Sequence, residues 1–334
     1  MTNLPSFSEI RNQFENYLLK SILVETLGFP LLQEMIFYHF GWQEPKRKTG
    51  KRLRPMLTLL SAELQTEDIS IAYPAAAAIE ILHNFTLVHD DIEDNSDTRH
   101  GQQTLWKKYG VAQAINTGDY MSSLALAMIS HSGSNRPELM MSTFLESSSE
   151  VTKGQHEDIK FEKLKTISEQ EYLRMIGRKT ASLFSASMKL GAISAGADEQ
   201  IIDKLGEIGH QYGIAYQIYD DYLGIWGDPS KTGKPAGNDL IEHKKSYPIL
   251  LGMQLDSSFG EIISSDKQFT PAEITKSIRL LESLGMKGRI ADEVNKRLAV
   301  GKTELDTLKE TSGLDTTRLI DYLYSLFNLV KSFD

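Results

Sequence analysis

Two long segments of this chain, Ile79–Asp94 and Gly206–Gly224, each carry an apolar stretch that runs into a pair of adjacent aspartates. The pairs are Asp90-Asp91 and Asp220-Asp221, and the second pair has apolar and aromatic residues on both sides. Carboxylates in such surroundings are costly to bury unless cations or hydrogen-bond donors compensate for the lost hydration. We therefore expect the chain to fold so that two acidic sites on facing helices share bound cations.

Helical signals dominate the rest of the chain, and the alternation typical of strands is hard to find. The segment 270–273 (Thr-Pro-Ala-Glu) is a capping box with proline at the first helical position, and Ile274, Ile278 and Leu281 follow at helical spacing. A run of four alanines at 75–78 predicts a close approach of neighbouring helix backbones. These patterns predict an all-α fold.

We predict a single domain over residues 1–334, a bundle of about ten or more helices around a central cavity. The charged stretch 256–268 is expected to be a loop. Helices are expected near 6–26, 51–66, 71–94, 111–130, 136–160, 167–194, 197–225, 239–254, 270–284, from 286 onward, and 315–326.

Composition excludes several classes of function. The formal charge of −9 argues against a broad surface for nucleic acid, although an acidic protein can bind small anions through local cations and bridging metals. No cysteine is present, which removes disulfides, thiolate zinc sites and thiol nucleophiles. Charged residues within 1–16 argue against a signal peptide, and no run of about 18 apolar residues predicts a membrane span. We expect a cytoplasmic protein.

The first acidic motif has the spacing of a cation site. On a helix, Asp90 and Asp94 lie on one face, one turn apart, so their carboxylates can share a hard divalent cation. Magnesium prefers carboxylates together with phosphate oxygens over an all-protein cage. The second pair, near Asp220, would supply a further ligand to the same kind of site.

Basic residues complete the pattern. Lys51 and Arg54 follow Gly50, and on a helix begun at this point they fall on one face, where the glycine lets the backbone approach an anion. Further cations stand at Arg99, Lys179, Lys234 and Lys244. Together with two acidic sites they predict a cavity for two diphosphate groups, one bound through magnesium and one through Lys and Arg.

These motifs resemble those of the trans-isoprenyl diphosphate synthases, and geranylgeranyl and farnesyl diphosphate synthases in particular. Leu87–Asp94 is similar to the first aspartate-rich motif of that family, and Gln217–Asp228 to the second. The segments Thr49–Pro55, Lys179-Thr180, Thr232–Pro235 and Lys244–Pro248 match in order and spacing, so the resemblance covers about residues 45 to 250.

The resemblance implies a role for each polar residue. Three magnesium ions on the allylic diphosphate would be held by Asp90, Asp94 and Asp220. The same diphosphate would be bound by Arg99, Lys179, Lys234 and Lys244. The diphosphate of isopentenyl diphosphate would be held by Lys51, Arg54 and His83, with His100 beside it. The oxygens of Thr180 and Gln217 would face the allylic carbon.

The implied reaction is a magnesium-dependent condensation of isopentenyl diphosphate with dimethylallyl, geranyl or farnesyl diphosphate. Diphosphate leaves readily only when its charge is neutralised, so the metals and lysines lower the barrier to ionisation. The double bond then attacks the allylic cation, and a proton is lost to the departing diphosphate. Water must be excluded because it would trap the cation. The family also implies a homodimer.

Three residues depart from the family pattern. Gly224 stands where the second motif usually has its third aspartate, and Gly224→Asp is expected to leave turnover largely intact. Thr49 replaces a glycine before Gly50, which is a minor change. His100 replaces the second arginine of the usual Arg-Arg-Gly, and histidine carries a full charge only when protonated.

The helix before the first acidic motif predicts the product. In the family the hydrocarbon chain grows down a tunnel beside this helix, and a bulky side chain one to two turns upstream forms the floor. Phe85 lies five residues before Asp90 and the small Thr86 four before, which resembles the geranylgeranyl (C20) pattern more than the farnesyl (C15) one. A phenylalanine packed in the core is the alternative interpretation.

Other functions would use some of the same residues. Glu80–His83 and Glu207–His210 are both Glu-x-x-His, as in di-iron helical bundles, but that interpretation leaves Lys51, Arg54, Lys179 and Lys234 without a role. A metal-dependent phosphohydrolase would need further histidines beside His89-Asp90. A class I terpene cyclase needs no second diphosphate site, and a non-catalytic subunit would have eroded motifs.

Overall fold

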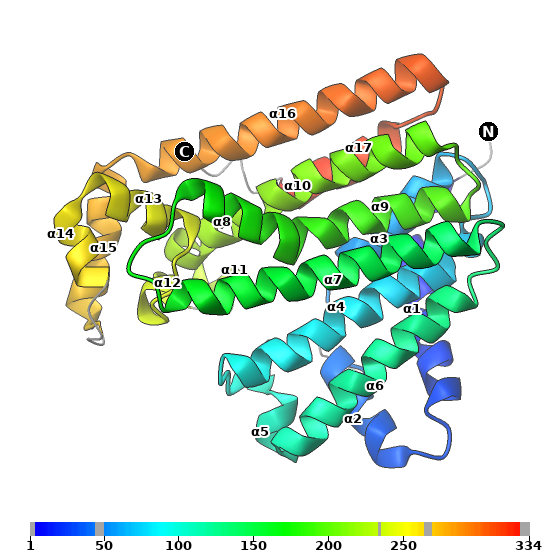
Figure 1. Cartoon of the computed structure of the whole chain (residues 1–334), viewed down its shortest axis with the longest axis horizontal. Helices are drawn as coiled ribbons and strands as arrows, with labels where there is room; N and C mark the ends of the chain where they lie inside the picture. Colours follow the sequence, from blue (N-terminus) through cyan, green and yellow to red (C-terminus); the bar gives the residue numbers. More distant parts are fainter. Residues whose placement is uncertain (1–3, 44–49, 233–234, 264–268, 328–334) are drawn as a thin grey trace. The chain divides into compact units, whose positions relative to one another are not determined.

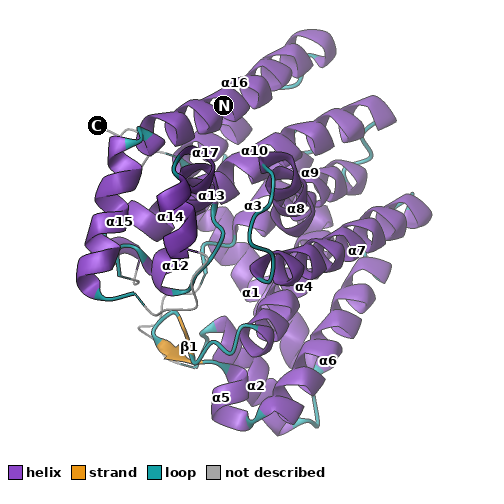
Figure 2. Cartoon of the chain, turned by 60° about the vertical axis from the view of Figure 1, so that its left-hand side comes forward, coloured by secondary structure: helices purple, strands orange, loops and turns teal. Residues whose placement is uncertain are grey.

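The protein is described by a computed structural model covering residues 4–43, 50–232, 235–263 and 269–327. Helices make up most of this part of the chain, and its sheet structure is the antiparallel pair β1 (Thr98–Arg99) and β2 (Gln102–Gln103), drawn in orange in Figure 2. The all-α prediction is confirmed.

The chain divides into two compact units. Unit 1 comprises Met1–Glu146 and Ala186–Gly206, and unit 2 comprises Ser147–Ser185 and Glu207–Asp334. Three helices, α7 (Pro137–Glu162), α9 (Ser182–Ser194) and α10 (Glu199–Trp226), run from one unit into the other along the chain. This division does not test the prediction that residues 1–334 form one domain, which stays a prediction.

In unit 1, the helix that carries the first acidic motif packs against two other helices. Its elements are α1 (Phe7–Glu25), α2 (Pro30–Phe40), α3 (Leu53–Glu63), the 3-10 turn η1 (Ile69–Ala72), α4 (Tyr73–Glu93), β1, β2, α5 (Leu105–Tyr109) and α6 (Val111–Ser130). Helix α4 packs against α3 and α6 (Figure 1), and the alanines at 75–78 are fully buried. Small side chains let these helices approach closely, as the sequence predicts.

Helix α2 was not predicted. Its sequence is mostly apolar, so no polar face marks a helical period, although proline stands at its start. It ends at Gly41, whose φ of 81° is the left-handed conformation typical of a helix C-terminus.

Unit 2 contains α8 (Glu169–Ile176), the π-helical turn η2 (Gly177–Ala181), α11 (Pro229–Thr232), α12 (Asn238–Ile241), α13 (Tyr247–Leu255), α14 (Ser257–Ile263), α15 (Pro271–Ser283), α16 (Met286–Ser312) and α17 (Thr317–Leu326). The capping box at α15 is present: Thr270 Oγ1 accepts from the Glu273 N–H (3.3 Å), and Thr270 N–H donates to the Glu273 carboxylate (2.8 Å). The helices predicted after Gly285 and Asp315 are confirmed.

Two predictions in unit 2 were wrong. The helix expected at 239–254 is broken into α12 and α13, because Pro248 cannot continue a helix from residue 244 and His243 adopts a φ of 53°. The loop expected at 256–268 contains α14, whose Phe259 and Ile263 lie one turn apart and are buried. Asp256 Oδ1 accepts from the Phe259 N–H (2.9 Å) at its start, and residues 264–268 lie outside the described chain.

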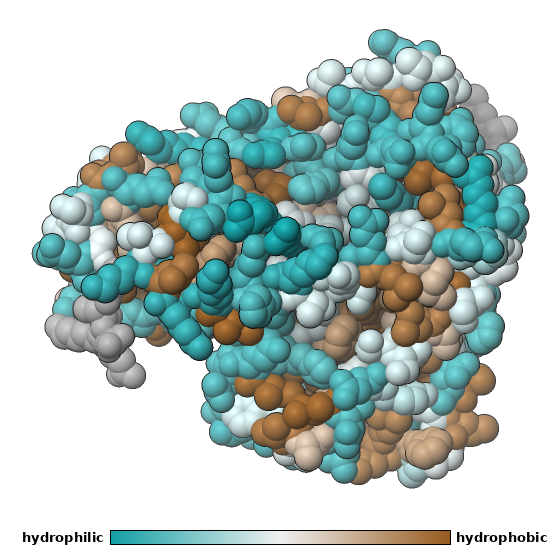
Figure 3. All heavy atoms as spheres, viewed as in Figure 1, coloured by the Kyte–Doolittle hydropathy of each residue, from teal (hydrophilic) through white to brown (hydrophobic). Residues whose placement is uncertain are grey.

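The surface drawn in Figure 3 is mostly hydrophilic, with hydrophobic side chains between the polar ones. In the described residues one helix, Ile69–Glu93, is long and apolar enough to cross a membrane by length and composition. That helix is α4 with its preceding turn, and most of it is buried within the protein as a core helix.

Candidate active site

The described residues of the predicted site fall into two groups, one in each unit. Unit 1 holds Lys51, Arg54, His83, Phe85, Asp90, Asp94, Arg99 and His100. Unit 2 holds Lys179, Thr180, Gln217, Asp220 and Lys244. Lys234 lies outside the described residues.

The first acidic motif occupies the C-terminal turn of α4, where the partial negative charge of the helix also attracts cations. Asp90 is half-buried and Asp94, which caps the helix, is exposed. Asp91 is buried and bound by Arg99, whose Nε donates to both carboxylate oxygens (2.9 and 3.0 Å) and whose Nη2 lies 2.8 Å from Oδ1. Burial raises the pKa of Asp91, against the opposing effect of Arg99. Asp90 and Asp94 are thus the more accessible carboxylates.

The three basic residues at the start of α3, Lys51, Arg52 and Arg54, have different surroundings. Arg52 is buried, donates to Glu15 through Nε and Nη2 (2.7 Å each), and donates to Glu80 through Nη1 (2.9 Å). Helix α3 begins at Leu53, so the expectation that Lys51 and Arg54 share a helical face was wrong. Lys51 precedes the helix and is exposed, whereas Arg54 lies in its first turn.

His83 lies on α4 among cations. Burial lowers the pKa of His83 well below its usual range, and the charges of Arg54 and Arg99 lower it further. Arg54 and Arg99 therefore each lie within electrostatic range of His83. At neutral pH His83 is uncharged, so it can donate one hydrogen bond to an anion while Arg54 supplies the charge.

His100 occupies the turn of the β1–β2 hairpin. Both His100 (φ 51°) and Gly101 (φ 78°) have left-handed backbone conformations, as a two-residue type I′ turn requires. His100 is exposed, while Arg99 beside it on β1 reaches Asp91. The hairpin thus presents one basic side chain to α4 and the other to solvent.

Lys179 and Thr180 lie in the π-helical turn between α8 and α9. Such turns shift the register of a helix and occur often at functional sites. Lys179 Nζ donates to Asp158 on α7 (2.6 Å). A Cβ atom on Gly154 would lie 2.4 Å from the Lys179 backbone nitrogen, so only glycine lets α7 approach this turn.

The second acidic motif repeats the arrangement of the first. Asp220 is exposed, whereas Asp221 is buried and accepts hydrogen bonds from the Tyr172 hydroxyl, the Tyr247 N–H (2.8 Å) and the Gln217 amide (3.0 Å). Burial, with the charge of Asp239 nearby, raises the pKa of Asp221 to about 7, and the three hydrogen bonds oppose this rise. In both motifs one aspartate is held by protein donors and its predecessor is nearer to solvent.

Gln217 also links to the π-helical turn. Its carbonyl Oε1 accepts a hydrogen bond from Thr180 Oγ1 (2.7 Å), so the two residues predicted to face the allylic carbon are in direct contact. Thr180 is buried and Gln217 is half-buried. Their oxygens are acceptors placed beside the second acidic motif.

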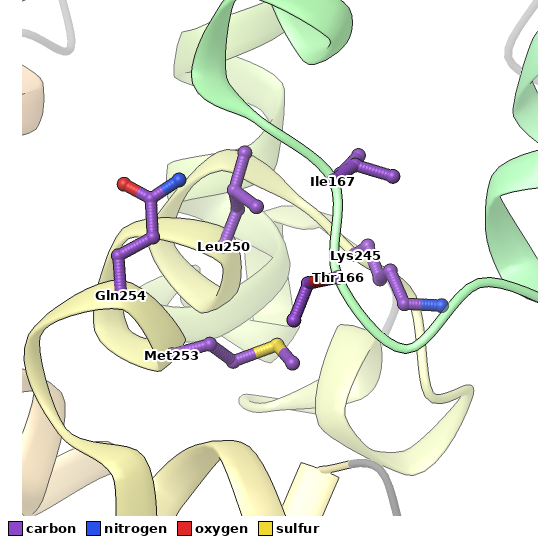
Figure 4. A pocket seen from close by; sticks show the side chains of 6 residues that line it. All are labelled: Thr166, Ile167, Lys245, Leu250, Met253 and Gln254. Atoms are coloured by element: carbon purple, nitrogen blue, oxygen red, sulfur yellow. The ribbon is translucent and has the colours of Figure 1, made fainter.

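Lys244 and Lys245 have different surroundings. Lys244 is exposed, lies 3.1 Å from Glu242, and its charge lowers the pKa of Asp239, which burial raises. Lys245 Nζ donates to the Phe161 and Glu162 carbonyls (2.7 and 2.8 Å) and so ties this connection to the end of α7. A hollow of about 80 Å³ beside Lys245 is lined by Thr166, Ile167, Leu250, Met253 and Gln254, none of them a predicted site residue (Figure 4).

The donor set fits magnesium bound through a substrate. Within the described ranges no three His, Asp or Glu side chains are placed to hold a metal ion by themselves. Magnesium usually binds one or two carboxylates together with substrate phosphates and keeps several waters. Oxygen donors one turn apart, at Asp90 and Asp94, meet that requirement.

Sequence reasoning missed several supporting residues. Tyr172 and Asp239 gave no periodic signal, because their roles depend on contacts between segments distant in sequence. A signal did exist for Asp158: Gly154, one turn before it, is a glycine inside a long helical pattern, which often marks a close packing contact. For the Glu-x-x-His alternative, Glu80 is bound by Arg52 and by Asn84 (3.1 Å).

Relatives of known function cover most of the chain. The polyprenyl synthetase family model matches residues 32–281. The geranylgeranyl diphosphate synthase of Saccharolobus solfataricus is 40% identical over 248 residues (73% of this chain, 72% of the relative), and that of Mycobacterium tuberculosis is 36% identical over 260 residues (76% and 74%). A (2E,6E)-farnesyl diphosphate synthase of Mycobacterium bovis is 36% identical over 241 residues (71% and 67%).

Solved structures agree with these relatives. A polyprenyl synthetase from Streptomyces coelicolor A3(2) has a TM-score of 0.87 and 31% identity, covering 97% of this chain and 98% of its own. A geranylgeranyl pyrophosphate synthase from Corynebacterium glutamicum, complexed with isoprenyl diphosphate and magnesium, has a TM-score of 0.84 and 25% identity, covering 99% and 100%. The chain therefore belongs to the polyprenyl synthetase family and is a trans-isoprenyl diphosphate synthase.

Proposed function

We propose that this enzyme joins isopentenyl diphosphate to an allylic diphosphate in a magnesium-dependent reaction, and that its product is geranylgeranyl diphosphate. The observation that carries the proposal is the shared design of the two acidic motifs. Asp91 and Asp221 are buried and bound by protein donors, whereas Asp90 and Asp220 are nearer to solvent. The related Corynebacterium structure with magnesium supports the choice of cation.

Asp90, Asp94 and Asp220 would hold magnesium, three ions in all, against the allylic diphosphate. Bound magnesium would supply charge neutralisation that makes diphosphate a leaving group. Arg99, Lys179, Lys234 and Lys244 would bind the same group. Lys51, Arg54, His83 and His100 would bind isopentenyl diphosphate, with Arg54 supplying charge and His83 a neutral donor.

Thr180 and Gln217 act on the carbon that ionises. The Thr180 hydroxyl donates to the Gln217 carbonyl, and the remaining lone pairs of the two oxygens would place partial negative charge toward the developing allylic cation. The double bond of isopentenyl diphosphate attacks this cation, and the proton lost from the adjacent carbon goes to the departing diphosphate. This order places the stabilising groups where charge develops.

The C20 product is supported by two observations. The geranylgeranyl synthases of Saccharolobus and Mycobacterium are among the relatives, and Phe85 is half-buried on α4, with its ring 5.1 Å from that of His89. A farnesyl synthase is also a relative, and a C15 product is the alternative. Incubation with farnesyl diphosphate, labelled isopentenyl diphosphate and magnesium, followed by sizing of the dephosphorylated product, separates the two, since a C15 enzyme leaves farnesyl diphosphate unextended.

A homodimer and a cytoplasmic location are predictions from the family resemblance. In unit 1, exposed apolar side chains surround a hollow lined by α2 and α6, Phe29 (64% exposed) and Leu31 (47%) among them. Apolar side chains exposed in this number support burial against a second copy. Sedimentation equilibrium tests this: a mass of one chain across the accessible concentration range would contradict the dimer.

A further inference from the structure

The direction of the Gln217 amide is chemically important. The two ends of a glutamine amide have nearly the same shape but opposite polarity: the carbonyl accepts, and the NH₂ group donates. If Gln217 stabilises an allylic cation, only the carbonyl end can do so. The amide must therefore be held in one of two orientations that packing alone distinguishes poorly.

Asp221 provides the discrimination. The carboxylate of Asp221 offers oxygen acceptors, and Gln217 Nε2 donates to Asp221 Oδ1 at 3.0 Å, one helical turn along α10. This directs the Gln217 carbonyl the other way, where it accepts from Thr180 Oγ1 at 2.7 Å. The Thr180 hydroxyl proton is therefore used in the hydrogen bond to Gln217, and the lone pairs of Thr180 Oγ1 face the other surroundings of Thr180.

Asp221 is itself fixed by two donors on its other oxygen. The Tyr172 hydroxyl on α8 and the Tyr247 N–H at the start of α13 both donate to Oδ2, so Oδ1 is turned to Gln217. Thr180 donates to Gln217, and Gln217 and Tyr172 donate to Asp221, so the series of hydrogen bonds ends at the Asp221 carboxylate. The acceptor ends collect at the Gln217 and Thr180 oxygens.

We propose that Asp221 is a positioning residue that sets the polarity of the Gln217–Thr180 pair, so that oxygens and not protons face the reacting allylic carbon. Tyr172 in turn sets the orientation of Asp221. This role rests on the proposed function of Gln217 and Thr180 in cation stabilisation. It differs from metal ligation, which the exposed neighbour Asp220 would perform.

Replacement by asparagine tests the polarity directly. In Asp221→Asn the remaining oxygen still accepts from Tyr172 and Tyr247, so the new NH₂ group faces Gln217 and requires an acceptor. Gln217 must then turn its carbonyl to Asn and its NH₂ group to Thr180. We expect kcat to fall about a hundredfold, with the KM values for both diphosphates changed less than about threefold.

A second substitution should restore the polarity. In Asp221→Asn with Gln217→Glu, the asparagine NH₂ donates to one glutamate oxygen, and the other oxygen accepts from Thr180. The net charge of the pair is that of the wild type. We expect kcat to recover to within about tenfold of the wild type, although Gln217→Glu alone, with two adjacent carboxylates, is strongly impaired. A double variant no better than Asp221→Asn would overturn the proposal.

Two tyrosines provide a second test, which remains valid even if the Asp221→Asn variant does not fold. Tyr172 and Tyr247 are both buried, stack with ring centroids 5.5 Å apart, and donate their hydroxyls to carboxylates. Tyr172→Phe removes a donor to Asp221 and should lower kcat several-fold at unchanged KM. Tyr247→Phe loses only the bond to Glu169 (2.6 Å), keeps its N–H on Asp221, and should keep the wild-type kcat.

Both tests use the full chain, farnesyl diphosphate, isopentenyl diphosphate and magnesium, with the melting temperature of each variant measured alongside. Equal loss of kcat in the two tyrosine variants, or wild-type kcat in Asp221→Asn, would show a purely structural role and overturn the proposal. Absence of turnover in the wild type would instead overturn the proposed function, and this role with it. The wild-type rate thus separates the two failures.

Discussion

The carboxylate of Asp239 occupies the space beside Gly224: a Cβ atom on Gly224 would lie 2.3 Å from Asp239 Oδ2 and 2.5 Å from its Cγ. Gly224 lies on α10 one turn after Asp220-Asp221, and Asp239 reaches this place from α12. Burial raises the pKa of Asp239, and the charge of Asp220 raises it further. The Asp239 carboxylate therefore fills the space that a side chain at residue 224 would need.

This relationship reverses the expectation from sequence for Gly224→Asp. The new side chain must displace Asp239 and would place two carboxylates together, so we expect a loss of about 1–3 kcal/mol in the free energy of unfolding and reduced turnover. Urea denaturation measures the first. Gly288→Asp on α16, where nothing lies within 4 Å, is the control helical glycine. Equal free energies of unfolding for Gly224→Asp and Gly288→Asp would contradict the clash. It would also be contradicted if adding Asp239→Gly to Gly224→Asp does not restore stability.

Arg52 is expected to stabilise the fold and not to bind substrate. Arg52→Met leaves Glu15 and Glu80 without their buried cation, and should lower the free energy of unfolding by about 3–5 kcal/mol. The exposed neighbour provides the comparison, since Lys51→Met should change it by less than about 0.5 kcal/mol. Similar urea midpoints for the two variants would contradict the assignment.

His83 should make stability depend on pH. Its folded-state pKa lies below the 6.5 of an ordinary histidine, so the unfolded chain binds more protons, and the contribution of His83 is lost as pH falls below about 6.5. Asp221, whose pKa is raised to about 7, has the opposite effect, so the comparison must be with His83→Gln. The free energy of unfolding should fall more steeply from pH 8 to 5.5 in the wild type than in this variant. Parallel curves would contradict the lowered pKa.

Phe85 is expected to limit product length. Phe85→Ala removes the ring that packs against His89 on α4 and should lengthen the products beyond C20, because the tunnel floor opens. Phe85→Tyr keeps the bulk and should leave the distribution unchanged. Chromatography of the dephosphorylated products measures both, and an unchanged distribution in Phe85→Ala would assign Phe85 to the core alone.

Local signals account for what the sequence could predict. The capping box at Thr270, the apolar period of α16 and the buried alanines of α4 each depend on residues within a few turns. The acidic motifs were found because their residues are contiguous. The sequence did not indicate which aspartate of each pair is held by protein donors. Arg99 binds Asp91 and Tyr172 binds Asp221 through contacts between separate elements, which no local pattern predicts. Likewise Arg52 and Arg54 look equivalent in sequence, and only burial separates them.

We expect the two acidic motifs together to support a magnesium-dependent condensation. The most direct test measures the turnover of farnesyl diphosphate and labelled isopentenyl diphosphate by the wild type, Asp90→Ala and Asp220→Ala. The wild type should make a C20 product with magnesium and none after chelation. Each variant should lose at least about a hundredfold in rate while keeping the wild-type melting temperature, because stabilisation of the leaving group is lost. Full turnover by Asp220→Ala, or by the wild type without a divalent cation, would contradict the assignment.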